Sequence, residues 1–295
     1  MLTLRELKEE VLRRPVRGLI LSGADGEICR KPERTRRILV HSVAKSVTAI
    51  GAGFALEEGY LSLDESVAEA FDMDLSKVES AVGNLRGEGA AKEHRKRLEK
   101  IRLTHLMSNT SGFGENYLTG FQRPYLTDDD WVTQCLSLPV TADAGSAFLY
   151  NDANWYLIAK LLQRRTGQRL TEYLLPRLFV PLGIRYPTWE VDPEGDIIGC
   201  GGLLLNLDEL HRLGLVCLHN GVYGGGRVIS GEWMKTAAEK KTDAPGGILD
   251  GSGYGYGYGF WTGPDYFSMF GLGGIYSFIS RSGDLLITVD GLELT

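Results

Sequence analysis

Apolar positions along the chain follow a helical spacing, then a strand spacing, then a helical spacing again. Residues 1–14 have the pattern of a charged amphipathic helix. Residues 17–23 and 26–31 are strand-like runs, and the Asp-Gly pair where they meet is a strong hairpin signal. From residue 42 to 60 apolar side chains recur on one helical face until the pattern stops at Gly59. These patterns predict a helix, two antiparallel strands and a largely buried helix.

Helical patterns dominate the middle of the chain, and its last third is mixed. Further helices are expected at residues 102–107, 154–165, 207–218 and 230–240. Residues 80–100 are rich in glycine and then charged, which is typical of an exposed insertion. Near the end, the β-rich runs IYSFIS and LLITVD are separated by turn residues 281–284, which predicts a second hairpin.

Strands at both ends and helices between them predict an α+β fold. A sheet assembled from the two ends of the chain would carry an inserted all-helical domain. On this basis residues 1–60 and 196–295 form the sheet domain, and residues 61–195 form the helical domain. A catalytic cleft is expected between the two parts.

Composition and charge mainly exclude functions. The 295 residues are 43% hydrophobic and 24% charged, as in an ordinary globular protein. A net charge of −6 argues against a nucleic-acid partner, because phosphate contacts need a surplus of Lys and Arg on one surface. No apolar run approaches a membrane span, and residues 1–14 lack the apolar core of a signal peptide. We therefore expect a cytoplasmic protein without a membrane partner, and its oligomeric state stays open.

The spacing of cysteine and histidine gives no sign of a metal or cofactor. The cysteines are far apart and form no Cys-x-x-Cys pair; they are Cys29, Cys135, Cys200 and Cys217. None of the five histidines forms a His-x-x-x-His or His-Glu-x-x-His pattern. We expect free thiols, no metal site and no cofactor.

The first candidate for chemistry is Ser42-Val43-Ala44-Lys45, the only Ser-x-x-Lys in the sequence. A serine at a helix start faces free backbone N–H groups, and a residue three positions on returns to the same face. Lys45 can act as a base toward Ser42 only when neutral, which burial favours. The plainer alternative is an N-cap serine with a lysine that extends to solvent.

The second candidate is Tyr150-Asn151-Asp152, just before the helix expected at residues 154–165. A tyrosine beside a lysine ammonium can move a proton to a leaving group, since a cation lowers its pKa by stabilising the phenolate. The alternative is that Tyr150 packs as an amphipathic residue at the helix entry.

Five stretches in order carry a family resemblance: HSVAKSVTA, IRLTHLMSNTSGF, AGSAFLYNDANWYLIAKLLQRRTG followed by LFVPLGI, GGLLLNLDELHRLG, and YGYGFW. Over nearly its whole length the chain resembles the serine β-lactamases of class C type, the penicillin-recognising D,D-peptidases and the esterases of the same fold. The resemblance implies a three-layer sandwich, with an antiparallel sheet flanked by helices. It also implies that Ser42 is the nucleophile, Lys45 its proton acceptor, and Tyr150 the group that protonates the leaving atom and later activates water.

The chain departs from the family's second motif at Asp152, where the family usually has Asn. A carboxylate can only accept hydrogen bonds, so Asp152 is expected to hold Lys45 as an ammonium and to make Tyr150 the more favoured base. Asp152 remains a candidate substrate-binding residue, but it offers no donor to the side-chain amide of a β-lactam.

The third motif, ordinarily Lys-Thr-Gly or His-x-Gly, is reduced to Gly271-Leu272-Gly273-Gly274. No cation remains there to hold a substrate carboxylate. The main-chain N–H groups of Gly273 and Gly274, with that of Ser42, are expected to bind the acyl oxygen, since glycine lets the backbone approach closely. The alternative is a β-bulge or a strand turn.

The family also closes its sheet with a C-terminal helix, whereas this sequence reaches Thr295 soon after the last expected strand. That face of the sheet is expected to be covered by the N-terminal helix, by another protomer or by nothing.

The favoured function is a serine hydrolase that acts on a small-molecule ester or amide, with small neutral esters preferred. β-Lactamase and D,D-carboxypeptidase activities are its nearest variants. The competing hypothesis is a ligand-binding or sensory module of the same fold without turnover, which the reduced third motif and Asp152 favour.

Overall fold

An antiparallel sheet built from both ends of the chain forms the centre of one half of the molecule. The structure is a computed structural model that describes residues 2–23, 26–30, 36–245 and 255–293. Within these residues the sheet has eight strands in the order β2-β1-β13-β12-β11-β10-β9-β8. Their bounds are β1 Gly18–Gly23, β2 Gly26–Arg30, β8 Thr242–Asp243, β9 Gly255–Tyr256, β10 Trp261–Thr262, β11 Tyr266–Gly271, β12 Ile275–Ser280 and β13 Leu285–Asp290.

The two predicted hairpins stand side by side in this sheet. Strand β1 pairs with β13 from Gly18 opposite Asp290 to Gly23 opposite Leu285, so the first and last long strands are neighbours. The hairpin between β12 and β13 turns at residues 281–284, as predicted. The turn predicted where β1 and β2 meet falls on Ala24 and Asp25, which lie outside the described residues.

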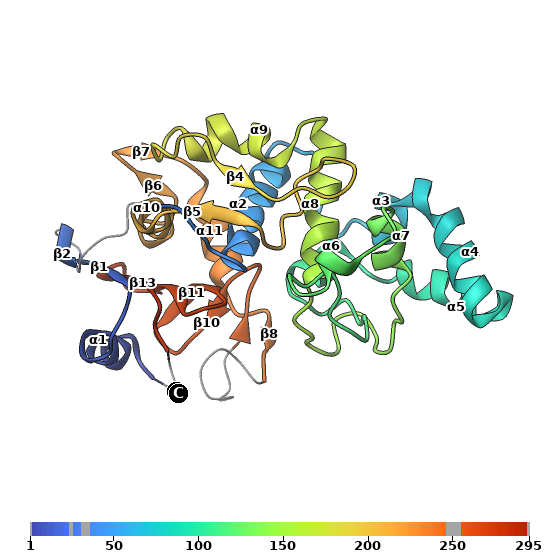
Figure 1. Ribbon diagram of the computed structural model, residues 1–295, viewed down its shortest axis with the longest axis horizontal. Coiled ribbons are helices and arrows are strands. Elements are labelled where there is room, and N and C mark those ends of the chain that lie inside the picture. The colour runs from blue at the N-terminus through green and yellow to red at the C-terminus, as the bar shows by residue number, and fades with distance from the viewer. Residues whose placement is uncertain (1, 24–25, 31–35, 246–254, 294–295) are drawn as a thin grey trace.

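Helix α1 (Leu4–Arg13) covers one face of the sheet. Thr3 and Glu6 cap its start reciprocally. Its buried residues Leu4, Leu7 and Val11 pack against apolar side chains of strands β1, β11, β12 and β13. In Figure 1 this helix lies below the sheet, on the side opposite the remaining helices. Of the three coverings expected for this face, the N-terminal helix is the one that the structure shows.

The other face of the sheet is covered by α2 (Val43–Glu57), α10 (Leu207–Leu218) and α11 (Gly231–Ala238). Helix α2 is buried from Val43 to Ala55, so it forms the middle of the main core. Sheet and helices together make three layers, with α1 as the outermost layer on one side (Figure 1). This arrangement agrees with the expected sandwich.

The central part of the chain is helical and lies beside α2. Its elements are α3 Val67–Ala70, η1 Asp72–Asp74, α4 Leu75–Arg86, α5 Glu88–Leu98, α6 Leu103–Met107, η2 Arg123–Tyr125, α7 Trp131–Leu136, α8 Asp152–Thr166, α9 Leu170–Leu174 and η3 Leu175–Phe179. Helix α8 packs directly against α2 and α6. It thereby joins the helical part to the layer that covers the sheet.

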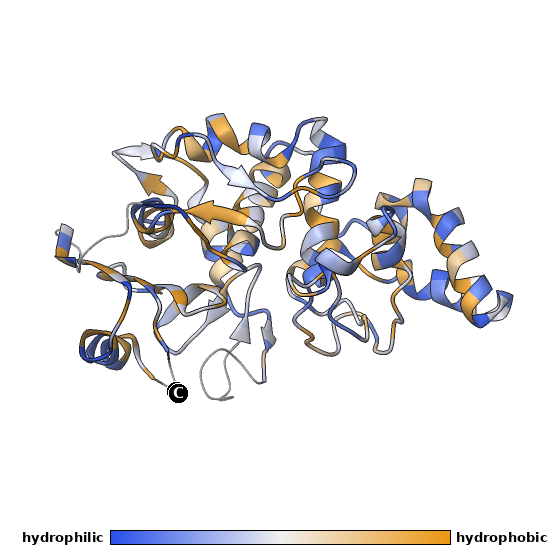
Figure 2. Cartoon of the chain, viewed as in Figure 1, coloured by the Kyte–Doolittle hydropathy of each residue, from blue (hydrophilic) through white to orange (hydrophobic). Residues whose placement is uncertain are grey.

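The segment predicted as an exposed insertion at residues 80–100 forms most of a helical hairpin, and many of its residues are exposed. Helices α4 and α5 meet at Gly87, which has a φ of +91°. Val78, Val82, Ala91 and Leu98 are buried between them and their neighbours. Figure 2 shows the alternation of hydrophilic and hydrophobic residues on these two helices. Helices α4 and α5 have few apolar residues among their glycines and charges, so the helical spacing was not evident in the sequence.

Short strands lead into and out of the region that holds Ser42. Strands β3 (Ile38–Leu39), β5 (Leu203–Leu205) and β4 (Thr188–Trp189) form one small sheet, and β6 (Val222–Tyr223) pairs with β7 (Gly226–Arg227). Strand β4 lies within the segment predicted as all-helical, 61–195. The division of the chain into two domains stays a prediction.

The cysteines are free thiols, as expected. Among the residues that the structure describes, no helix combines the length and the apolar character needed to cross a membrane.

Candidate active site

Ser42 lies at the junction between strand β3 and helix α2. His41 before it has a left-handed φ of +50°, which turns the chain into the helix. Ser42 already has helical dihedrals, and its hydroxyl makes no capping hydrogen bond. Its Oγ atom accepts instead from Lys45 Nζ at 2.9 Å. Because Lys45 is 1% exposed, it is not a lysine that extends to solvent, and the N-cap interpretation does not apply.

The ammonium group of Lys45 has three oxygen partners. Besides Ser42, Nζ donates to the main-chain oxygen of Cys200 at 2.6 Å and forms an ion pair with Asp152 Oδ1 at 2.7 Å. An ammonium has three N–H bonds, so all of its donors can be used here. The carboxylate of Asp152 is the charge that balances this buried cation.

Tyr150 and Asp152 are placed by the start of helix α8. Asn151 caps the helix, since its side chain accepts from the N–H of Ala153 at 3.0 Å. The N–H of Asp152 donates to Asn116 Oδ1 at 2.7 Å, which holds the first helical residue against a neighbouring loop. The sequence motif therefore delivers its two polar side chains to Lys45 from a rigid support.

The ring of Tyr150 lies in an aromatic cluster. It stacks on Trp261 with ring centroids 5.4 Å apart, and Lys45 Nζ lies 4.9 Å from the centroid of the Tyr150 ring. Loss of hydration and the negative charge of Asp152 raise the pKa of Tyr150 well above its ordinary value, while a hydrogen bond with Ser42 acts in the opposite direction. The net shift of this pKa is therefore upward, in spite of the neighbouring lysine. Tyr150 is a neutral phenol at pH 7.

The glycines of the third motif are displaced from their expected place. Gly273 and Gly274 form the turn between β11 and β12, where the oxygen of Gly273 accepts from Arg17 Nη2 at 2.9 Å. A Cβ atom on Gly274 would lie 2.2 Å from the oxygen of Leu292, so this glycine packs closely against the backbone just after strand β13. The alternative interpretation, a strand turn, fits these two residues.

The residue of strand β11 that approaches the segment around Ser42 is Gly271, two positions before Gly273. A Cβ atom on Gly271 would lie 2.2 Å from the main-chain oxygen of Val40, so the strand approaches the segment before the serine as closely as backbone allows. Phe270 and Leu272 on either side contribute to the wall of the pocket that contains Ser42.

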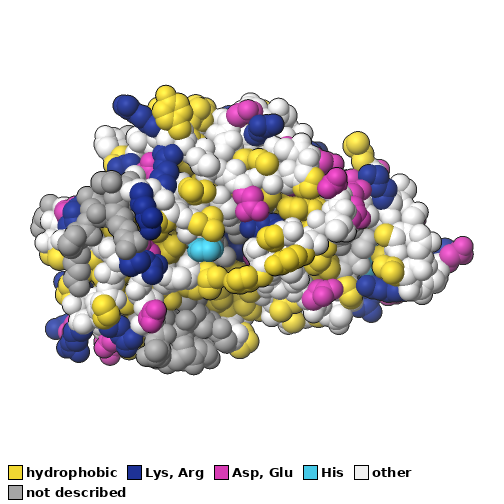
Figure 3. Space-filling view, in the orientation of Figure 1, with side chains coloured by type: hydrophobic (Ala, Val, Ile, Leu, Met, Phe, Trp, Pro, Cys, Tyr) yellow, Lys and Arg dark blue, Asp and Glu magenta, His cyan; other side chains and the backbone are white. Residues whose placement is uncertain are grey.

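This pocket has a volume of about 600 Å³ and a mixed lining. Apolar walls come from Leu39, Phe121, Pro124, Phe270 and Leu272, and polar groups from His41, Ser42, Asn116, Thr119, Arg123, Tyr150, Asp152 and Glu190. In Figure 3 hydrophobic side chains gather across the middle of the visible face beside one histidine. Burial and the positive charges of Arg123 and Lys45 lower the pKa of His41, so its imidazole is neutral at pH 7.

Arg123 is held within the pocket by a two-bond ion pair. Its Nε and Nη2 donate to the two carboxylate oxygens of Glu190 at 2.8 and 2.9 Å, and its Nη1 donates to the oxygen of Leu118 at 2.7 Å. The guanidinium is thus already satisfied by protein groups. Its charge is balanced before any substrate binds.

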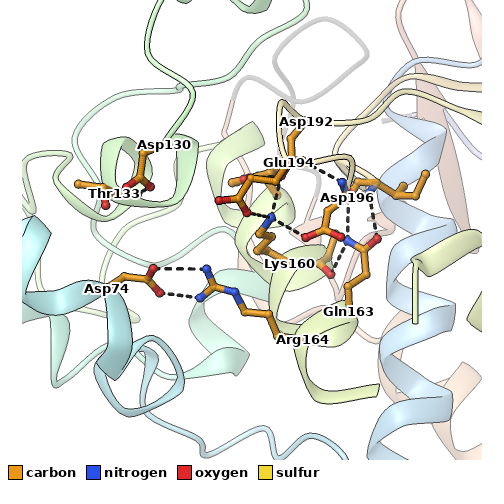
Figure 4. Close-up of polar contacts among 12 residues, drawn as sticks. Asp74, Asp130, Thr133, Lys160, Gln163, Arg164, Asp192, Glu194 and Asp196 are labelled. Atoms are coloured by element: carbon orange, nitrogen blue, oxygen red, sulfur yellow. Dashed lines mark hydrogen bonds and ion pairs between the residues drawn. The ribbon is translucent and has the colours of Figure 1, made fainter. Parts of the chain in front are cut away.

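The loop that supplies Cys200 is anchored by the middle of helix α8. Figure 4 shows Lys160 reaching between three carboxylates of this loop. Its Nζ donates to Asp192 at 3.0 Å, to Asp196 at 2.5 Å and also to Glu194. These three acidic residues are the group with metal-like spacing in the described part of the chain, and the lysine supplies the positive charge there.

Side chains of α8 and α2 continue this anchoring toward Lys45. Gln163 Oε1 accepts from the N–H of Ile197 at 2.9 Å, and its Nε2 donates to the oxygen of the same residue at 3.0 Å. One step further, Thr48 Oγ1 of α2 donates to the oxygen of Gly199 at 2.9 Å. The next carbonyl is that of Cys200. The orientation of the Cys200 carbonyl, which accepts a hydrogen bond from Lys45, therefore depends on residues that do not line the pocket.

A model of the beta-lactamase family matches residues 23–289, nearly the whole chain. This chain belongs to the beta-lactamase family. Both the expected family and the expected α+β fold are confirmed by this match and by solved structures. A beta-lactamase from Mycobacterium bovis has a TM-score of 0.67 over 98% of this chain and 92% of its own, at 18% identity. At that identity the likeness concerns the fold.

Curated relatives of this beta-lactamase-family chain include both transferases and a hydrolase. It is 32% identical over 181 residues to the acyltransferase mokF of Monascus pilosus, a match that covers 58% of this chain and 41% of that protein. It is 35% identical over 96 residues to the 6-aminohexanoate-dimer hydrolase of Paenarthrobacter ureafaciens, covering 32% of this chain and 24% of that protein. The matched region thus spans about two fifths of the length of the first of these relatives.

Several residues around Ser42 in this family member were not found from the sequence. His41 could have been found, because it directly precedes the serine of the Ser-x-x-Lys motif. Arg123 and Glu190 are 67 positions apart, and Cys200 contributes its main-chain oxygen, so none of these three residues belongs to a short motif. The structure brings together Ser42, Lys45, Tyr150 and Asp152 from the predicted set, and it leaves Gly273 and Gly274 outside.

Proposed function

We propose that this member of the beta-lactamase family transfers an acyl group through an acyl-enzyme on Ser42, with water or a small alcohol or amine as the final acceptor. The observation that carries the proposal is the 2.9 Å contact between Lys45 Nζ and Ser42 Oγ at the wall of a pocket large enough for a small molecule. Relatives named as an acyltransferase and as a hydrolase support this breadth, because both reactions share the acyl-enzyme step.

Tyr150 is proposed to act first as an acid. Its raised pKa keeps the phenol protonated, and Tyr150 lies beside Lys45 at the wall of the pocket that contains Ser42, where its proton can pass to the atom that leaves when the acyl-serine forms. In the second half of the reaction the same oxygen can accept a proton from the incoming water or alcohol. Lys45 remains the group that moves the proton of the serine itself.

Main-chain donors are proposed to bind the developing oxyanion. Within the described residues the N–H groups of Ser42 and Leu272 donate to no protein acceptor, and both residues line the pocket. Two such donors, one at a helix start and one just after the end of a strand, are the usual parts of an oxyanion hole. Leu272 thus replaces Gly273 and Gly274 in this role, and the serine contributes the second donor as expected.

Neutral esters and amides are the proposed substrate class. The charge of Lys45 is balanced by Asp152 and that of Arg123 by Glu190, so among the described residues of the pocket no cation is left for a substrate carboxylate. The apolar walls favour an uncharged acyl group. Penicillins and D-alanyl peptides, which carry a carboxylate, are expected to be poor substrates. A cytoplasmic location, which fits small-molecule esters better than cell-wall peptides, stays a prediction.

The test is labelling of the purified chain with a fluorophosphonate, followed by intact-mass and peptide analysis. We expect one adduct, on Ser42, that is lost in Ser42→Ala and kept in the surface control Ser76→Ala. Short-chain nitrophenyl esters should be turned over faster than a chromogenic cephalosporin, and an added alcohol should divert part of the product to its ester. An unlabelled wild type, or an adduct that survives Ser42→Ala, contradicts the proposal. A stable acyl adduct without turnover favours the sensory module instead.

A further inference from the structure

Asp152 forms an ion pair with the lysine that contacts the proposed serine nucleophile. Its Oδ1 lies 2.7 Å from Lys45 Nζ, its side chain is 13% exposed, and its backbone is held by Asn116. The ion pair is therefore formed inside the protein, where the low dielectric reduces the advantage of charged over neutral partners. A proton can move between these two groups without either side chain changing position.

Neither Lys45 nor Tyr150 is a free base in the resting site, and within the described residues the neutral imidazole of His41 makes no hydrogen bond to Ser42. The three N–H bonds of the Lys45 ammonium are directed at three oxygens, so its nitrogen has no lone pair for the proton of the serine. Tyr150 also holds its proton at neutral pH. Acylation therefore requires that Lys45 first gives up a proton.

Only one of the three partners of Lys45 can accept that proton. Cys200 offers a main-chain carbonyl, and Ser42 is the group that must itself be deprotonated. We propose that the carboxylate of Asp152 stores the proton during acylation, with Lys45 as the relay between it and Ser42. This inference rests on the proposed acyl-enzyme chemistry and adds to it the residue that makes Lys45 a base.

The steps balance. One Nζ–H bond of Lys45 breaks, and its proton forms an O–H bond on Asp152, which leaves a neutral pair. The Oγ–H bond of Ser42 then breaks toward Nζ as Oγ bonds to the acyl carbon and the carbonyl oxygen gains the negative charge. On collapse, Tyr150 gives its proton to the leaving atom. The stored proton returns from Asp152 through Lys45 to the phenolate, and the site regains its starting charges.

Other titratable groups around this pair are part of the same electrostatic setting. Arg123, Cys200 and Tyr256 interact electrostatically with Asp152, and His41 interacts with Lys45 and Arg123. Burial raises the pKa of the Cys200 thiol to about 12, and that of Tyr256 is also raised, so both hold their protons at neutral pH. Within this set Asp152 is the carboxyl group in contact with Lys45.

The experiment compares Asp152→Asn, Asp152→Glu and the exposed control Asp129→Asn by the rate of Ser42 acylation, measured as the burst of nitrophenol from about pH 5 to about pH 9. Asn keeps the shape and an acceptor oxygen but cannot take a proton. We expect Asp152→Asn to acylate roughly a hundredfold more slowly at neutral pH and to speed up as pH rises, since Lys45 must then lose its proton to solvent. Asp152→Glu should recover about tenfold over Asn, and Asp129→Asn should match wild type.

A residue that only positions Lys45 gives the opposite order, because the isosteric Asn preserves the geometry better than the longer Glu. Asp152→Asn with the wild-type rate and pH profile overturns the inference, as does an Asn variant faster than the Glu variant. If Asp152→Asn does not fold, wild-type acylation in mixtures of H₂O and D₂O decides. A curved dependence on deuterium content supports a two-proton relay, and a linear dependence overturns it.

The two proposals fail in different ways. A wild type without an adduct on Ser42 overturns the acyl-enzyme function and this inference with it. If wild type is labelled on Ser42 and Asp152→Asn acylates with the wild-type rate and pH profile, only the proposed role of Asp152 as proton acceptor is overturned.

Discussion

Lys45 Nζ donates to the main-chain oxygen of Cys200 at 2.6 Å, a contact between residues 155 positions apart in the chain. The direction of the ammonium therefore depends on the loop before strand β5 as well as on helix α2. That loop is fixed to α8 by Lys160 and its three carboxylate partners (Figure 4). Contacts between helix α8 and this loop, away from the pocket, thus help to orient Lys45, the residue that contacts Ser42.

We predict that Lys160→Met weakens both the fold and the site. Removing the buried cation leaves Asp192, 1% exposed at its side chain, without its charge partner. Loss of one partner of a buried ion pair costs roughly 3 kcal/mol, so the free energy of unfolding in urea should fall by about that amount and acylation should slow. The exposed lysine variant Lys77→Met is the control and should unfold like wild type.

The same variant offers a second readout. The oxygens of Asp192, Glu194 and Asp196 lie within 4.8 Å of one another, a spacing that suits a hard cation once the lysine is gone. Millimolar calcium should therefore restore part of the stability of Lys160→Met and leave wild type unchanged. An Lys160→Met protein with wild-type stability would show that the three carboxylates need no cation.

Replacing Glu190 by glutamine should change substrate preference. Arg123 would keep its place through the oxygen of Leu118 but lose its balancing charge. A charge-assisted bond to a substrate carboxylate should then lower KM for nitrophenyl hemisuccinate roughly tenfold, while KM for the neutral nitrophenyl butyrate stays near that of wild type. Equal changes for both esters would indicate a general disturbance of the pocket, and this prediction would be wrong.

His211 should make stability depend on pH. Its side chain is 5% exposed and its two ring nitrogens lie 2.8 Å from the hydroxyls of Ser22 and Thr288. Burial lowers the pKa of His211 to about 4. The unfolded chain therefore binds a proton that the folded chain does not, so stability falls as pH drops from about 6.5 to about 4, by roughly 3 kcal/mol.

The measurement is the free energy of unfolding at several pH values for wild type and His211→Gln. The glutamine variant cannot be protonated, so its stability should change less with pH over this window, even if it is less stable at pH 7. Parallel pH profiles for the two proteins would contradict the assignment.

Gly271→Ala is expected to disturb the serine through the backbone. The new methyl group would lie 2.2 Å from the oxygen of Val40, and neither atom belongs to a flexible side chain. We expect a loss of about 2 kcal/mol of stability and a marked loss of labelling at Ser42. Gly89→Ala in helix α5 is the matched control, because a Cβ atom there meets nothing within 4 Å. It should stabilise the protein slightly, by about 0.5 kcal/mol. If the two variants behave alike, Gly271 has no special contact with the serine segment.

Local patterns in the sequence were sufficient for several elements. The helix expected at 207–218 is α10, Leu207–Leu218, because its apolar residues repeat at helical spacing between an Asn cap and a polar end. The β12–β13 hairpin was predicted from its turn residues. The helical hairpin α4–α5 was not, since its glycines and charges left too few apolar positions to show a period.

The sequence by itself determined that Ser42 and Lys45 would meet, since two residues three positions apart on a helix share a face whatever surrounds them. Only the tertiary structure decided what that pair touches. The raised pKa of Tyr150, the carbonyl of Cys200 and the balance of Arg123 by Glu190 all arise where segments far apart in the chain pack together. Charge and hydration at such a site depend on every neighbour, and a single chain pattern records only the neighbours along the chain.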